Sequence, residues 1–178
     1  MTTDTDTVTS DELSSHELTQ EQRVSVFAPA SIGNVSVGFD VVGLAVKPVN
    51  GTLLGDVVSV ELADEDSLVV IGAFADKLPS NKEDNIVWSC LQLFNQALTD
   101  AKQNISTVKL TLDKKMPVGS GLGSSACSVV AALVGLNTFY AKHKNFSFDE
   151  KAVLKMTGQM EAQISGSLHY DNVAPCYL

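Results

Sequence analysis

Four stretches of the chain predict β-strands, and the first and last of them alternate hydrophobic and polar residues with a period of two, which is typical of strands with one buried face. They cover residues 23–30, 56–64, 66–74 and 106–116. The first stretch is followed by a segment with three closely spaced glycines, Gly33, Gly38 and Gly43, for which we expect a loop or a set of tight turns. The dipeptide Asn50-Gly51 predicts a further turn.

Three later segments predict helices. The first and the third repeat their hydrophobic residues with helical spacing, so each predicts a helix with one stripe of side chains facing the core. The two stripes are Val87, Leu91, Phe94 and Leu98, and Val153, Met156, Met160 and Ile164. The pairs Ser80–Glu83 and Ser147–Glu150 have capping-box spacing and predict where these two helices begin. The middle segment, residues 124–142, is apolar on most sides, so we expect it at the centre of the fold.

The predicted elements run from a strand-rich start to helix, strand, helix and helix. This order indicates an α+β fold and not a steady βαβ alternation. We expect one domain over residues 23–178, preceded by an acidic tail over residues 1–22. The tail carries six of the 21 acidic residues and no Lys or Arg. It is also rich in Thr and Ser, and we expect it to be disordered.

Composition narrows the possible functions further. The net charge is −9, and neither the tail nor the nearly neutral remainder offers the basic surface that nucleic acid binding requires. No apolar run approaches the roughly 20 residues of a membrane span, and the first residues lack a signal-peptide pattern. We therefore expect a cytoplasmic protein that binds no membrane. Cys90, Cys127 and Cys176 are too few and too scattered for a disulfide framework, so we expect buried free thiols.

The segment PVGSGLGSSAC, residues 117–127, places three glycines and three serines between a predicted strand and a predicted helix. Glycines let the backbone approach a ligand closely, and a helix start offers free N–H groups and a partial positive charge. The segment therefore predicts a polyphosphate site, with a tight turn and a serine cap as the simpler alternative. It lacks the Walker A lysine, the third glycine of the dinucleotide fingerprint and the GxSxG spacing, so the residues alone predict a phosphate site of no common type.

This segment resembles the ATP loop of the GHMP kinases, and two further segments support the resemblance. APASIGNVSVGFDVVGLA, residues 28–45, is similar to the N-terminal motif of the family in the form that homoserine kinases carry. MEAQISGSLHYDNVAP, residues 160–175, resembles the homoserine kinase segment that supplies a metal-binding glutamate and part of the substrate pocket. The three motifs follow one another in the family's order, so the chain resembles the homoserine kinase branch of the family.

The resemblance implies a fold and an activity. The fold is an N-terminal lobe like domain 2 of ribosomal protein S5, and the ferredoxin-like C-terminal lobe of the family is expected to be absent from this chain. The activity is ATP-dependent phosphorylation of the L-homoserine hydroxyl, a step of threonine biosynthesis, with magnesium as cofactor. The resemblance also implies a homodimer. A non-catalytic MgATP-binding fragment, another GHMP small-molecule kinase and a structural S5-like domain remain open alternatives.

The resemblance also assigns the ATP and metal contacts. Ser125 and Glu161 are expected to be catalytic by holding magnesium. Helical periodicity alone favours a solvated helix residue for Glu161, and the family motif reverses that preference. Asn85 is a weaker candidate for an adenine contact, with a helix cap as its alternative. The remaining expected ATP contacts form the loop itself: Pro117, Val118, Gly119, Ser120, Gly121, Leu122, Gly123, Ser124, Ala126 and Cys127.

The expected L-homoserine contacts lie in the other two motifs. Asn34 and Asp40 would suit a ligand with an ammonium group and a hydroxyl, although both residue types are also common in turns. His169, Asp171 and Asn172 form a polar cluster after the last predicted helix. We do not expect a strong protein base, because homoserine kinases are thought to work without one.

Overall fold

The computed structural model describes residues 22–36, 41–166 and 168–177. The predicted acidic tail therefore lies outside the described residues except for Gln22, and Asp40 lies outside them as well. All three cysteines are free and buried, as the composition predicted.

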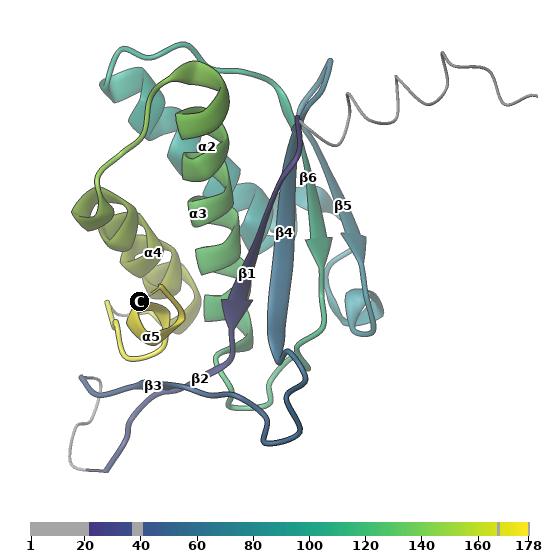
Figure 1. Ribbon diagram of the computed structural model, residues 1–178, viewed down its shortest axis with the longest axis vertical. Coiled ribbons are helices and arrows are strands. Elements are labelled where there is room, and N and C mark those ends of the chain that lie inside the picture. Colours follow the sequence, from purple (N-terminus) through teal and green to yellow (C-terminus); the bar gives the residue numbers. More distant parts are fainter. Residues whose placement is uncertain (1–21, 37–40, 167, 178) are drawn as a thin grey trace, which may run out of the picture.

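One layer of the fold is a four-stranded sheet with strand order β1-β4-β6-β5 (Figure 1). Its strands are β1 (Val24–Pro29), β4 (Gly55–Leu62), β5 (Ser67–Ile71) and β6 (Val108–Asp113). The central strand β4 is antiparallel to both β1 and β6, whereas β5 and β6 are parallel. Each strand falls within one of the four stretches predicted as strands, apart from the first residue of β4, so these predictions are confirmed.

The second layer consists of helices packed against one face of the sheet (Figure 1). They are α2 (Ile86–Asp100), α3 (Ser124–Lys144), α4 (Glu150–Ser165) and the short α5 (Val173–Tyr177), with 3-10 turns at Ala75–Lys77 and Lys82–Asp84. Helix α3 contacts β1, β4 and the other three helices. It is long and apolar enough to span a membrane, but 72% of its apolar window is buried inside this lobe. We therefore assign α3 as the central core helix that the sequence predicted.

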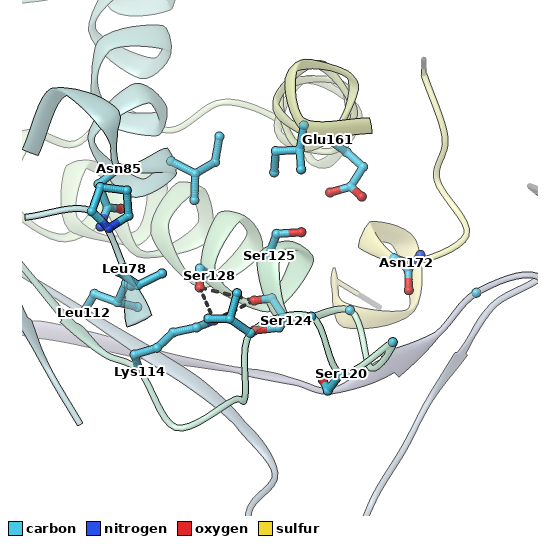
Figure 2. A pocket seen from close by; sticks show the side chains of 18 of the residues that line it. Leu78, Asn85, Leu112, Lys114, Ser120, Ser124, Ser125, Ser128, Glu161 and Asn172 are labelled. Carbon is cyan, nitrogen blue, oxygen red and sulfur yellow. Dashed lines mark hydrogen bonds between the residues drawn. The ribbon is translucent and has the colours of Figure 1, made fainter. Parts of the chain in front are cut away.

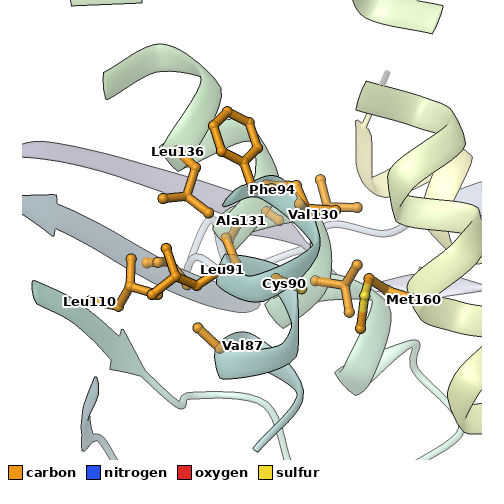
Figure 3. Packing of buried hydrophobic residues seen from close by; sticks show 14 of the residues in the cluster. Val87, Cys90, Leu91, Phe94, Leu110, Val130, Ala131, Leu136 and Met160 are labelled. Carbon is orange, nitrogen blue, oxygen red and sulfur yellow. The ribbon is translucent and has the colours of Figure 1, made fainter. Parts of the chain in front are cut away.

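The register of β4 and β6 decides what faces the helices. Val58 and Val60 pair with Leu112 and Leu110, and all four side chains are fully buried. Figure 3 shows this core, in which side chains of α2 pack against those of α3 and the sheet. Because side chains alternate along a strand, Asp56 precedes Val58 on the inward face. Lys114 follows Leu112 on the same face, so two charged groups enter the core at one end of the sheet.

Both predicted capping boxes are wrong. Helix α2 begins at Ile86, and the side chain of Asn85 caps it by accepting the N–H of Val87. Ser80 is too far upstream because residues 82–84 form a separate 3-10 turn. Helix α4 begins at Glu150 and is capped by Asp149, whose carboxylate accepts the N–H of Ala152.

Three further details differ from the sequence predictions. Val153, Met156 and Met160 are buried as expected, but Ile164 is 48% exposed because it lies beside an open cavity. The glycine-containing segment after β1 includes a small hairpin of β2 (Ser31–Ile32) and β3 (Leu44–Ala45), which the pattern did not predict. Helix α5 was not predicted either, because five residues are too few to show a helical period.

Candidate functional site

A cavity of about 540 Å³ opens where the glycine loop meets the first turn of α3 (Figure 2). Its walls come from four regions that are distant in sequence: the loop after β2, the segment before α2 with the start of that helix, the chain from the end of β6 through the glycine loop to the start of α3, and the chain from the end of α4 to the turn before α5. Figure 2 shows Leu78 and Asn85 at one side, Glu161 and Asn172 at the other, and serines of α3 between them.

The glycine loop has a backbone that strongly favours glycine. Gly119, Gly121 and Gly123 have φ angles of 73°, 73° and 62°, all in the left-handed region. A Cβ atom on Gly123 would also overlap the hydroxyl of Ser31. Gly123 is the N-cap residue of α3 and has no side chain to cap the helix. The serine-capped turn is therefore not what forms, and the start of α3 faces the cavity as an anion site requires.

Ser125 and Glu161 project into the same cavity from α3 and α4 (Figure 2). Burial raises the pKa of the Glu161 carboxyl, the Asp171 charge raises it further, and His169 opposes both. Glu161 is thus a half-buried carboxyl and not a solvated helix residue. No group of three His, Cys, Asp or Glu side chains in the described ranges could hold a metal by itself. A hydroxyl and one carboxylate nevertheless fit magnesium, which completes its shell with phosphate oxygens and water.

The two polar atoms of the Asn85 side chain have different surroundings. Its Oδ1 caps α2 by accepting the N–H of Val87 at 3.0 Å, so the cap interpretation is confirmed. The residue is also buried, lines the cavity, and its Nδ2 has no hydrogen-bond partner among the described residues. An unsatisfied buried donor costs free energy, so a ligand acceptor at this position would be favourable.

The predicted substrate residues separate into two groups. Asn34 and Asn172 line the cavity, and Asn34 is also a turn residue with a φ of 55°. Asp171 is buried beside the cavity, where its Oδ2 accepts the N–H of Asn34 at 3.0 Å. His169 is half-buried and does not line the cavity, but its charge acts on Glu161. The structure thus places Asp171 as a support for Asn34.

The predicted ATP loop is longer than the part that lines the cavity. Val118, Gly119, Ser120, Gly121 and Gly123–Ser125 form the wall, together with residues of other elements.

Pro117, Leu122, Ala126 and Cys127 do not line the cavity. Ala126 and Cys127 are fully buried on the core side of α3, and the thiol of Cys127 donates to the Pro29 carbonyl at 2.9 Å. The carbonyl of Leu122 accepts the N–H of Ser31. These contacts give Leu122, Ala126 and Cys127 structural roles around the loop.

Sequence reasoning missed two parts of the site. Leu78, Pro79 and Ile86 form an apolar wall beside Asn85, and no local pattern indicated it. Lys114 and Ser128 lie at the floor of the cavity. The inward register of Lys114, two residues after Leu112, was the available signal for that part.

Comparisons with known proteins agree with this geometry. A family model described as "GHMP kinases N terminal domain" matches residues 85–178, more than half of the chain. Homoserine kinase from Buchnera aphidicola subsp. Acyrthosiphon pisum (strain APS) is 54% identical over 155 residues. This match covers 87% of the chain and 48% of the relative. The chain therefore spans about half the length of the curated relatives it matches.

Solved structures show the same likeness. Homoserine kinase from Cytophaga hutchinsonii has a TM-score of 0.71 and 35% identity, over 88% of this chain and 46% of that one. Mevalonate kinase from Methanococcus jannaschii has a TM-score of 0.61 over 87% and 51%, and its 17% identity supports the fold alone. The predicted resemblance and the α+β fold class are thus confirmed. The chain belongs to the GHMP kinase family and carries the N-terminal domain of that family.

Proposed function

We propose that this chain is the nucleotide-binding lobe of a kinase that transfers the γ-phosphoryl group of ATP to the hydroxyl of L-homoserine, as in threonine biosynthesis. One observation carries the proposal: the uncapped start of α3, the glycine loop and Glu161 all face one cavity. The 54% identity to a homoserine kinase supports the choice of substrate. A metabolic kinase of this type would be cytoplasmic, and its partners would be small molecules.

The layout of the cavity suggests an orientation for ATP. The apolar wall of Leu78 and Ile86, with the free Nδ2 of Asn85, suits a flat base that carries ring-nitrogen acceptors. The triphosphate would follow the N–H groups of the glycine loop toward Ser125. Homoserine would then lie at the far side, near Asn34 and Asn172.

Ser125 and Glu161 are the residues that would hold magnesium. When bound, the ion would neutralise charge on the β- and γ-phosphates. Burial and the Asp171 charge raise the pKa of Glu161, and a cation bound beside it would favour its charged form.

The reaction needs few other groups. The homoserine hydroxyl oxygen would form a bond to the γ-phosphorus while the bond between that phosphorus and the bridging oxygen breaks and ADP leaves. The hydroxyl proton would pass to a phosphate oxygen or to water. We do not assign Asp171 as a base, because its carboxylate already holds the Asn34 N–H. Catalysis would rest on positioning and charge stabilisation.

Phosphorus NMR of the chain with MgATP and L-homoserine tests the proposal. We expect an O-phosphohomoserine signal that falls by roughly a hundredfold or more in Glu161→Gln. Gln163→Ala is the matched control, since this exposed residue lies on the same helix and should leave the rate unchanged. Mevalonate and galactose in place of homoserine test the other GHMP substrates.

The outcomes separate the alternatives. MgATP binding without product, followed by product from a chain extended to the length of the relatives, would assign this chain as a binding lobe that needs the rest of the protein. Product from mevalonate or galactose alone would reject homoserine. No MgATP binding at all would favour a structural domain and contradict the proposal.

A further inference from the structure

A buried ion pair lies directly beneath the glycine loop. Lys114 follows β6 and Asp56 begins the inward face of β4, and their side chains are 2% and 0% exposed. The Nζ of Lys114 is 2.5 Å from Oδ2 of Asp56. It also donates to the carbonyl of Ser124 at 2.8 Å and to the hydroxyl of Ser128 at 3.0 Å (Figure 2).

Every polar atom of the pair has a partner. Lysine has three ammonium protons, and Lys114 has three acceptors for them. Asp56 Oδ2 also accepts from the hydroxyl of Ser128 at 2.7 Å. Its Oδ1 accepts the backbone N–H groups of Lys115 at 3.0 Å and Met116 at 2.9 Å.

These partners lie at the two ends of the glycine loop. Lys115 and Met116 are the last residues before it, whereas Ser124 and Ser128 belong to the first two turns of α3. Asp56 therefore fixes the chain as it enters the loop, and Lys114 fixes it as it leaves. The hydroxyl of Ser124 also donates to the Met116 carbonyl, although at a longer 3.4 Å.

Stability alone does not explain such a pair. Two charges lose their hydration on burial, and apolar side chains of similar volume are often as stable or more stable. A fully satisfied network does fix geometry, since its bonds are strong and directional where water is excluded. The segment between its anchors, residues 117–123, consists largely of residues that the rest of the structure leaves exposed.

We propose that Asp56, Lys114 and Ser128 are positioning residues that clamp both ends of the phosphate loop and hold its N–H groups ready for ATP. This inference rests on the proposed function, because the loop is assigned to phosphate there. The three residues act through the loop, so their loss should weaken MgATP binding more than it weakens the fold.

The charge-neutral double variant Asp56→Asn/Lys114→Met tests the clamp. The first substitution retains an acceptor for the entering backbone, the second removes the ammonium contacts to Ser124 and Ser128 of α3, and together they leave no unpaired charge. We expect MgATP affinity, measured by calorimetry, to fall by roughly 10- to 100-fold. Amide exchange in residues 117–124 should accelerate by about tenfold, while exchange in α2 stays unchanged.

The matched control removes another ion pair of the same sheet. Lys109 and Glu61 are 3.0 Å apart and more exposed than the buried pair. Glu61→Gln/Lys109→Met should change neither the affinity nor the loop exchange. Wild-type affinity and wild-type loop exchange in Asp56→Asn/Lys114→Met would overturn the clamp, whatever its melting temperature.

Two further measurements keep the clamp testable if the double variant does not fold or if the wild-type chain binds no MgATP. If the double variant does not fold, Ser128→Ala removes one partner and should weaken MgATP binding by about three- to tenfold. Unchanged affinity and unchanged loop exchange in Ser128→Ala would then overturn the clamp. If the wild-type chain binds no MgATP, the proposed function fails for this chain, and the exchange experiment still decides whether the loop is clamped.

Discussion

Glu161 combines a proposed magnesium-binding position with a cost to the stability of the fold. Its carboxyl lines the cavity, and burial together with Asp171 raises its pKa. A raised carboxyl pKa means that folding favours the protonated form. The charged carboxylate therefore lowers the free energy of unfolding, and this loss is absent below the ordinary pKa of 4.5 and fully present once the pH exceeds the raised pKa.

We predict that Glu161→Gln raises the melting temperature of the ligand-free chain at pH 7 to 8. The advantage should shrink as the pH falls and vanish near pH 4, where Glu161 is protonated in both states. Thermal unfolding as a function of pH measures this difference. A lower melting temperature for the variant at neutral pH would show that the charged carboxylate stabilises the apo fold.

Asn85 allows the cap and the ligand contact to be separated. Asn85→Ser keeps an acceptor for the Val87 N–H and loses Nδ2, whereas Asn85→Ala loses both. We expect both variants to weaken MgATP binding by about 3- to 10-fold, the value of one hydrogen bond. Only Asn85→Ala should lower the free energy of unfolding, by about 1 kcal/mol.

Magnesium tripolyphosphate is the control ligand for Asn85, because it carries no base. Its affinity should be the same in the wild type and in Asn85→Ser. Equal losses for both ligands would place Asn85 against the phosphates, and no loss for either would leave it as a helix cap alone.

At the scale of elements, the helix starts show how local contacts override sequence spacing. Ser147 and Glu150 have the capping-box spacing, but the chain uses Asp149, whose Oδ1 accepts the Ala152 N–H at 2.8 Å. Asp149→Ala should lower the free energy of unfolding by about 1 kcal/mol. Chemical denaturation measures it, with Ser147→Ala as the control that should change it by less than about 0.5 kcal/mol. A larger loss of unfolding free energy for Ser147→Ala than for Asp149→Ala would support the Ser147–Glu150 capping box instead.

The sequence predicted the elements that are long enough to show a period. The strands and helices α2 and α4 fold where their hydrophobic patterns place them, and α3 was recognisable because it is apolar on most sides. The β2–β3 hairpin has two residues per strand and α5 has five, so neither repeats often enough to show a pattern. Their positions depend on contacts with distant segments, which a local pattern does not contain.

The candidate site was predictable to the extent that its chemistry is local. The glycine loop and the start of α3 are contiguous, so their residues indicated a phosphate site. Asp56 and Lys114 are 58 positions apart and meet through the β4–β6 pairing, which follows from register only once the strand order is known. The apolar wall of Leu78 and Ile86 depends on where the segment before α2 lies, and no residue pattern fixes that.

At the scale of the whole molecule, the proposed substrate side of the cavity is a junction of three distant segments. The β2–β3 hairpin meets the glycine loop where the Ser31 N–H donates to the Leu122 carbonyl at 3.1 Å. It meets the turn before α5 where the Ser31 hydroxyl donates to Asn172 Oδ1 at 3.2 Å. One hairpin therefore contacts both the glycine loop and Asn172, a predicted substrate residue.

Gly43 is the closest point of this junction, since a Cβ atom there would overlap the backbone carbonyl of Asp171. Backbone moves less easily than a side-chain end, so Gly43→Ala should separate the hairpin from the turn. We expect the free energy of unfolding to fall by about 1 to 3 kcal/mol. MgATP affinity should fall as well, because Ser31 would lose its position against Leu122. Ala45→Ser, an exposed change in the same hairpin, should alter neither quantity. Wild-type stability and affinity in Gly43→Ala would mean that hairpin and turn do not pack together, and that the two sides of the cavity are positioned independently.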